Sequence, residues 1–193
     1  MTATRTFLIT GGALLVGAVL GFAVDRTALH ERATDPTATT TRAAPTVLQD
    51  RAHAFLQRYV DDTGRVVRLD QGGDTVSEGQ AYAMLIAVGV RDEGTFDRIW
   101  QWTRTNLRRS DGLLSWHWAN GSVADPQSAA DADLDTARAL VLAGHAFGRG
   151  GLVRAGTALG TAILREETVA TPDGRLLLPG PWADHRAPYL VDP

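Results

Sequence analysis

Two short acidic stretches carry the residues of this chain that are best suited to chemistry. The first is SEGQ at 77–80, with Glu78 as its carboxylate, and the second is DADLD at 131–135. Each opens an apolar run that predicts a helix, so these carboxylates stand in first turns, where the helix dipole favours the ionised form. A lone carboxylate there is commonly only a partner of the dipole, but two such helix starts can face one cleft. Glycoside hydrolysis uses two carboxyl groups that face each other across a cleft, so the pattern favours a glycosidase-type site.

The spacing of the neighbouring residues leaves several roles open. Ser77 and Gln80 have the spacing of a capping box, which predicts that the Ser77 side chain caps its helix. Asp131 can either contact a substrate or simply cap the helix that follows it. Asp133 and Asp135 can support it or only make the start of that helix acidic.

Aromatic residues suited to sugar binding lie near both stretches. The segment LLSWHW at 113–118 predicts a short strand that ends at the turn NG, 120–121. We expect the two tryptophans of this segment, Trp116 and Trp118, to point in opposite directions. We assign Trp116 to stacking on a pyranose ring and Trp118 to the core. Tyr82, on the helix that SEGQ opens, is a candidate for lining the cleft.

The composition excludes several other classes of function. The chain has 193 residues, a formal net charge of -3 and no cysteine. That charge is too small to indicate nucleic acid or an anionic surface as a partner. The absence of cysteine excludes disulfides, thiol catalysis and zinc sites built on cysteine. The histidines show no ligand spacing and no nucleotide fingerprint is present, so we expect neither a metal nor a cofactor.

Composition also divides the chain into three segments. Residues 1–27 hold an apolar run, Thr6–Val24, preceded by Arg5. Such a run predicts a signal peptide or a membrane anchor, and hence a protein that is secreted or held at the cell membrane outside the cytoplasm. Residues 28–46 are rich in Thr, Ala and Pro and predict a flexible linker. The folded domain is expected from 47 to 193.

Within this domain the apolar pattern predicts mostly helices. The expected helices cover 47–60, 78–90, 93–107, 132–147 and 152–166. Those at 78–90 and 132–147 are apolar almost all round, which predicts burial on most sides. The other three are amphipathic. This alternation of buried and amphipathic helices predicts an all-α fold with two layers of helices.

Several separated motifs share one resemblance. They are TVSEGQAYAM at 75–84, FDRIWQW at 96–102 with NL at 106–107, SAADADL at 128–134, and REE at 165–167 with LLPG at 177–180. Together they resemble glycoside hydrolase family 8, in particular the endoglucanases associated with bacterial cellulose synthesis. The similarity covers residues 47–193. Ala130, Thr136 and Arg138 depart from the family pattern but leave the acidic positions intact.

The resemblance implies a fold and a mechanism. The fold is an (α/α)6 barrel, and the reaction is inverting hydrolysis of a β-1,4-glucan such as cellulose. Glu78 is implied as the general acid and Asp131 as the carboxylate that orients the substrate. Asp133, Trp116, Tyr82 and Gln80 are then candidates for substrate binding. A general acid needs a raised pKa, so burial and the nearby aspartates have to outweigh the helix dipole at Glu78.

The resemblance also implies that this chain is only the N-terminal half of the family fold. The catalytic base of the family is an aspartate in the second half. We therefore expect the chain alone to be inactive and self-associated, and to need a C-terminal partner half. Two alternatives stay open: an inactive glucan-binding remnant, and a hydrolase of chitosan, mixed-linkage glucan or xylan.

Overall fold

The computed structural model describes residues 46–191. The predicted signal or anchor segment and all of the linker except Thr46 lie outside the described residues. No helix within 46–191 is both long and apolar enough to cross a membrane. In chain order the elements are α1 (Val47–Tyr59), β1 (Thr75–Val76), α2 (Ser77–Gly89), α3 (Glu93–Asn106), β2 (His117–Ala119), β3 (Ser122–Asp125), α4 (Ala130–Ala146), α5 (Gly150–Glu166), β4 (Thr168–Thr171) and β5 (Gly174–Leu177).

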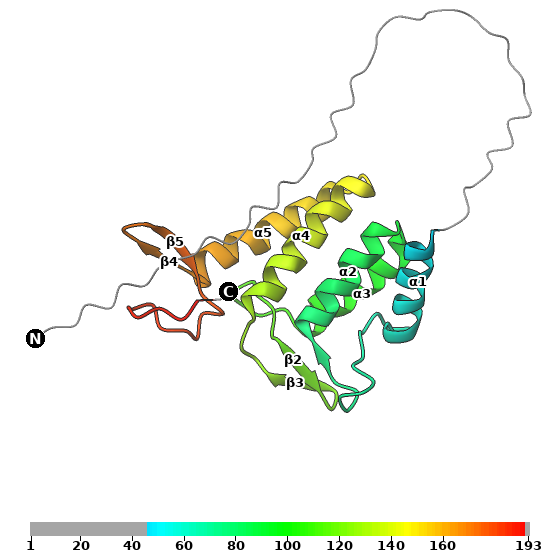
Figure 1. Ribbon diagram of the computed structural model, residues 1–193, viewed down its shortest axis with the longest axis horizontal. Helices are drawn as coiled ribbons and strands as arrows, with labels where there is room; N and C mark the ends of the chain where they lie inside the picture. Colours follow the sequence, from blue (N-terminus) through cyan, green and yellow to red (C-terminus); the bar gives the residue numbers. More distant parts are fainter. Residues whose placement is uncertain (1–45, 192–193) are drawn as a thin grey trace, which may run out of the picture. The chain divides into compact units, whose positions relative to one another are not determined.

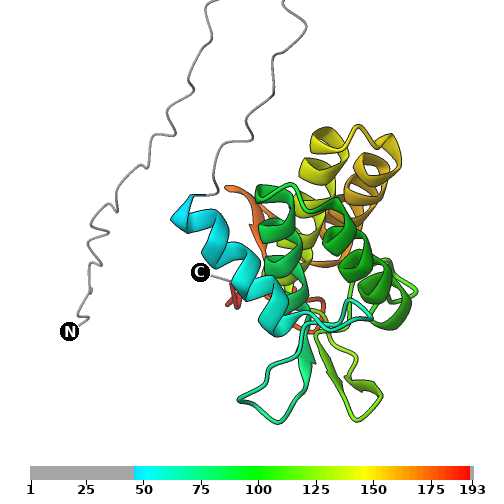
Figure 2. The same ribbon diagram turned by 90° about the vertical axis from the view of Figure 1, so that its right-hand side faces the viewer.

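The two helices that carry the acidic stretches lie side by side. Helix α2 packs against α4, while α1 and α3 pack on α2, and α5 packs on α4 (Figure 1). Figure 2 views the same helices from the side of α1, drawn in cyan. Small buried residues such as Ala83, Ala87 and Ala143 bring the two inner helices close together around the larger Met84 and Leu140. The predicted all-α, two-layer arrangement is therefore confirmed for this part of the chain.

Glycines set the close approach of α4 and α5. A Cβ added to Gly144 would lie 2.5 Å from Val153 Cγ2, and one added to Gly156 would lie 2.7 Å from the Ala137 carbonyl oxygen. Any side chain at these positions has to push the two helices apart, since packed interiors leave no spare room. The α4–α5 pair thus forms a rigid support for the acidic start of α4.

A small antiparallel sheet joins the start of α2 to the segment around Trp116. Its strand order is β1-β2-β3, and Val76 pairs with His117. The ladder continues one residue further, where the Ser77 N–H donates to the Trp116 carbonyl at 2.9 Å. The hairpin between β2 and β3 turns at Asn120 and Gly121, whose φ angles of 53° and 83° are the positive values that a type I′ turn requires. The predicted turn is confirmed.

The expected strand over 113–118 is shifted toward the C-terminus. Strand β2 begins only at His117, and Leu114 forms an isolated bridge with Arg108. The backbone N–H groups of Leu113 and Leu114 are taken by side chains instead, donating at 3.1 Å to Asp111 Oδ1 and to Asp133 Oδ1 respectively. Donors held by carboxylates cannot form a regular ladder, so the strand starts after them.

The predicted capping of α2 by Ser77 is wrong, and the alternative of a cap on α4 by Asp131 is excluded. Val76 is the N-cap of α2 and Ala129 that of α4, and neither helix has a side-chain cap. Ser77 lies inside the helix, with its Oγ 3.3 Å from Glu78 Oε2. Asp131 is likewise not an N-cap. The backbone N–H groups at these helix starts are satisfied partly by neighbouring chain segments, as where Ala130 N–H donates to the Pro179 carbonyl at 3.0 Å.

Candidate active site

Glu78 lies half-buried in the first turn of α2. Burial raises the pKa of its carboxyl above the ordinary value, and the negative charge of Asp131 adds to this effect. Hydrogen bonds from its own backbone N–H and from Ser77, and the charge of Arg68, act in the opposite direction. Desolvation therefore outweighs the polar groups around the carboxyl, and it shifts the equilibrium of Glu78 toward the protonated form.

Asp131 lies beside a hollow of about 540 Å³, within the range of small-molecule sites. The hollow is lined by two tryptophans, Trp116 and Trp182, together with Ser128 and Pro179. Asp131 stands in the first turn of α4 and is exposed. The structure thus brings together three of the predicted site residues: Glu78 and Asp131 interact through their charges, and Asp131 and Trp116 share one hollow.

The Trp116 ring stacks on its neighbour His117, which is held in place by Asp74. The centroids of the two rings lie 4.8 Å apart, with their planes at 27°. His117 Nε2 lies 2.9 Å from Asp74 Oδ2, and Arg68 Nε donates to the other oxygen of Asp74 at 2.7 Å. These two partners hold the pKa of Asp74 below its ordinary value, with the hydrogen bond from Arg68 as the larger cause. His117 therefore stacks on one face of Trp116, and the loop that holds Arg68 and Asp74 fixes His117.

Trp118 points away from the hollow, although residues two apart in a regular strand share a face. Trp116 precedes β2 and the strand register shifts between His117 and Trp118, so the two indoles diverge. The Trp118 ring packs edge-on against Trp102, with centroids 5.4 Å apart at 76°, beside the buried Leu107 and Leu114. Tyr82 is 50% exposed on α2. Burial and the charges of Asp131, Asp135 and Glu78 raise the pKa of its hydroxyl, so Tyr82 lies near the acidic groups of both helices.

Gln80 does not lie in the cleft, and its predicted substrate contact is corrected. It is fully buried, and its Oε1 accepts the Val66 N–H at 2.5 Å. Its Nε2 donates to Thr103 Oγ1 at 2.7 Å and to the Gly64 carbonyl at 3.3 Å. The amide therefore ties the segment before β1 to α2 and α3, and no group of it is left for a sugar.

The prediction that Asp133 binds substrate is also corrected, because Asp133 lies inside the protein. It is fully buried, and its Oδ1 accepts the Leu114 N–H at 3.1 Å, while Oδ2 has no partner among the described residues. Burial raises the pKa of Asp133 to about 9, and the charge of Glu167 adds to the shift. Asp133 is therefore held neutral in the core, where it fixes the segment that leads to Trp116.

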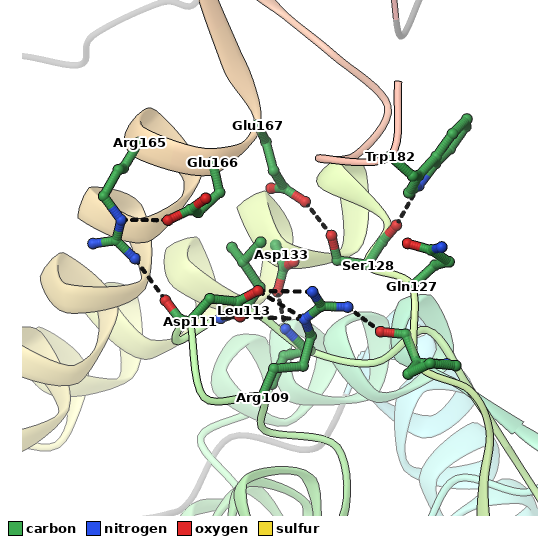
Figure 3. Close-up of polar contacts among 12 residues, drawn as sticks. Arg109, Asp111, Leu113, Gln127, Ser128, Asp133, Arg165, Glu166, Glu167 and Trp182 are labelled. Carbon is green, nitrogen blue, oxygen red and sulfur yellow. Dashed lines mark hydrogen bonds and ion pairs between the residues drawn. The ribbon is translucent and has the colours of Figure 1, made fainter. Parts of the chain in front are cut away.

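Sequence reasoning missed a buried chain of hydrogen bonds that reaches the hollow from the other side (Figure 3). Glu167, at the end of α5, accepts a hydrogen bond from the Ser128 hydroxyl at 2.7 Å. The Ser128 carbonyl accepts one from the Trp182 indole N–H at 3.1 Å. Burial raises the pKa of Glu167 to about 7, with the charge of Asp111 adding to it. Glu167 lies in the motif REE and Ser128 in the motif SAADADL, but no spacing in the sequence links them to each other or to Trp182.

The described residues hold no group of three His, Cys, Asp or Glu side chains that could bind a metal ion. What the site offers is a half-buried acid with a raised pKa, an exposed carboxylate beside it, and a hollow with aromatic walls. An acid of this kind can donate a proton, and the hollow can take a ring with apolar faces and a polar rim.

Comparison with known proteins agrees with this fold. The family model of Glycosyl hydrolases family 8 matches residues 39–193. A probable endoglucanase of Novacetimonas hansenii is 36% identical over 141 residues, which are 71% of this chain and 41% of the relative. The endo-β-1,4-glucanase CMCax of Acetobacter xylinum superposes with a TM-score of 0.69 at 33% identity, covering 75% of this chain and 46% of the other. An endoglucanase of Klebsiella pneumoniae gives a TM-score of 0.65 at 31% identity, over 68% and 44% of the two chains.

The chain belongs to glycoside hydrolase family 8. Its helices α1 to α5 are part of the (α/α)6 barrel that the sequence resemblance implies, as the superpositions on solved endoglucanases of the family confirm. The chain spans less than half the length of these relatives.

Proposed function

We propose that this chain contributes the acid side of an endo-β-1,4-glucanase that hydrolyses cellulose-like polysaccharide with inversion. One observation carries the proposal: Glu78 is half-buried beside Asp131, so that desolvation and a neighbouring charge raise its pKa. The names of the similar proteins, a probable endoglucanase and an endo-β-1,4-glucanase, support the choice of substrate.

In the proposed reaction, Glu78 protonates the glycosidic oxygen as the bond from that oxygen to the anomeric carbon breaks. A water molecule attacks the anomeric carbon from the opposite face and gives its proton to a second carboxylate. Asp131 hydrogen-bonds the hydroxyls of the sugar at the point of cleavage and keeps them oriented. The negative charge of Asp131 also favours the protonated form of Glu78 before the reaction.

The second carboxylate is proposed to come from an aspartate in the second half of the family fold. The chain spans 41% of the relative from Novacetimonas hansenii, so that half is proposed to be supplied as further chain or as a partner. We also propose that residues 1–27 export the protein and leave it secreted or tethered to the cell membrane. To test this export, cells that express the chain with or without residues 1–27 are fractionated, and the fraction that holds the protein is identified.

The test combines a reducing-sugar assay on carboxymethyl cellulose with a pull-down on insoluble cellulose. Both are run on the full chain and on the chain mixed with a second chain that matches the remaining part of an endoglucanase relative. We expect the chain alone to bind cellulose without cleaving it, and the mixture to release sugars as the α-anomer. Binding without cleavage in the mixture would favour the inactive glucan-binding remnant. If the mixture cleaves chitosan, mixed-linkage glucan or xylan faster than cellulose, that polysaccharide is the substrate instead.

A further inference from the structure

A charged loop leads from the end of α1 to the helix that carries Glu78. Its two ends, Arg68 and Asp74, pair as an isolated antiparallel bridge, in which the Arg68 N–H donates to the Asp74 carbonyl at 3.0 Å. Gly72 and Gly73, with φ angles of 82° and 74°, turn the chain between them. Asp74 lies directly before β1, and Glu78 lies in the first turn of α2 that follows. The backbone thus fixes an acidic and a basic residue just ahead of the candidate acid.

Both oxygens of the Asp74 carboxylate are engaged. Oδ1 accepts Arg68 Nε–H at 2.7 Å, and Oδ2 accepts an N–H from Arg68 Nη2 and lies 2.9 Å from His117 Nε2. A guanidinium held by two parallel hydrogen bonds is fixed in direction as well as in position. The Arg68 side chain is nevertheless 31% exposed, against 13% for Asp74. Arg68 therefore has room to turn elsewhere once the carboxylate is removed.

The charge of Arg68 acts against the proton on Glu78. Burial and the charge of Asp131 raise the pKa of the Glu78 carboxyl, whereas the charge of Arg68 lowers it. A guanidinium paired directly with Glu78 would stabilise the carboxylate further and remove the acid. The other titratable groups at this end of α2 come from the loop, β2, α2 and α4, and they are Asp70, Asp74, His117, Tyr82, Asp131 and Asp135. Arg68 differs from all of them in carrying a permanent positive charge.

We propose that Asp74 is a positioning residue for the proton donor: it holds the Arg68 guanidinium in the loop and so keeps that charge from pairing with the Glu78 carboxyl. The role of Glu78 as donor rests on the proposed function. Asp74 touches neither the sugar nor the reacting bond, and it acts through Arg68. His117 supports this arrangement at the second oxygen of Asp74, and it also stacks on Trp116. One loop thereby steadies both the acid and an aromatic wall of the hollow.

The first measurement is a carboxyl ¹³C NMR titration of Glu78 in the full chain, kept in mild detergent because of its apolar N-terminal run. Asp74→Asn is expected to lower the pKa of Glu78 by about 1 pH unit, because the released guanidinium pairs with it. In an Arg68→Gln background the same change should lower that pKa much less, since no guanidinium is left to release. Asp97→Asn is the control, because it breaks another aspartate–arginine pair, 2.6 Å from Arg149 on the α3 side, and it should leave Glu78 as in the parent.

The second measurement is the pH dependence of kcat on cellohexaose, with each variant mixed with the C-terminal half. A general acid works only while it is protonated, so the alkaline limb of the profile should move to lower pH in Asp74→Asn by the same amount as the pKa of Glu78. Arg68→Lys keeps the charge but cannot form the two-bond contact, so it should move the limb in the same direction.

Each outcome decides the proposal. An unchanged pKa of Glu78 in Asp74→Asn overturns it and leaves the proposed function standing. Equal falls with and without Arg68 also overturn it, because Asp74 would then act through its own charge. If Asp74→Asn does not fold, Arg68→Lys decides, and an unchanged pKa of Glu78 in that variant overturns the proposal. A fall seen by NMR without movement of the alkaline limb would overturn both this role and the proposed function, because Glu78 would not be the donor.

Discussion

Replacing Asp133 by asparagine should stabilise the protein at neutral pH, because the buried carboxyl imposes a cost that grows with pH. In the folded chain its pKa is raised to about 9 from the ordinary 3.8, chiefly by burial. Above pH 3.8 the unfolded chain releases this proton while the folded chain retains it. The contribution of this group to the free energy of unfolding is therefore fully present below pH 3.8. It falls by about 1.4 kcal/mol per pH unit as the pH rises toward 9. At pH 7 the accumulated cost is at most about 4 kcal/mol.

Asparagine has the shape of the protonated acid and cannot ionise, but its amide N–H groups replace an oxygen without a partner, which costs about 1–3 kcal/mol at every pH. Its carbonyl oxygen can still accept the Leu114 N–H that Asp133 Oδ1 accepts at 3.1 Å. We therefore expect the free energy of unfolding of Asp133→Asn, relative to the parent, to rise by up to about 4 kcal/mol between pH 4 and pH 7. Urea unfolding followed by tryptophan fluorescence at pH 4, 5.5 and 7 measures this difference.

Asp133→Ala is the matched control. It leaves the Leu114 N–H buried without an acceptor, which costs about 1–3 kcal/mol at every pH, in addition to the cavity. A gain from Asp133→Asn that is independent of pH, or a loss that is greatest at pH 7, would refute the reasoning. Either result would mean that the folded chain holds Asp133 ionised.

Two further predictions concern the helix pair and the acid. Gly156→Ala should lower the free energy of unfolding by about 1–3 kcal/mol, because the new Cβ meets the Ala137 carbonyl at 2.7 Å. Gly160→Ala, in open space on the same helix, should raise it by about 0.5–1 kcal/mol, and equal effects of the two in urea unfolding would contradict the close α4–α5 contact. In a carboxyl ¹³C NMR titration Glu78 should show a raised pKa that moves back toward the ordinary value in Asp131→Asn. An unchanged pKa in that variant would remove Asp131 as a cause.

The helices could be predicted from the sequence because their apolar patterns are local and long. The five expected helices agree with α1 to α5 to within a few residues at their ends. The runs around Met84 and Leu140 are apolar on nearly every side, which already indicated that α2 and α4 lie inside. The signal for the turn at Asn120 and Gly121 was equally local, because two successive positive φ angles favour asparagine and glycine.

The roles of single polar residues could not be predicted, because they depend on partners far away in the chain. The SEGQ stretch has the capping-box spacing, yet Gln80 bonds to Val66, Gly64 and Thr103. Asp133 and Asp131 are two residues apart on α4, and only the packing of the helix shows that the first is buried and the second exposed. The same holds for Trp182, which reaches the site through Ser128.

The central claim is that Glu78 is the proton donor, and hydrolysis by a Glu78→Gln variant tests it most directly. The measurement compares parent and variant, each mixed with the C-terminal half, on cellohexaose and on an aryl cellobioside whose leaving group needs no proton. The account predicts a fall of about 10²–10⁴-fold on cellohexaose, a much smaller fall on the aryl substrate, and unchanged cellohexaose binding. Near-parental cleavage of cellohexaose, or equal falls on both substrates, would contradict it.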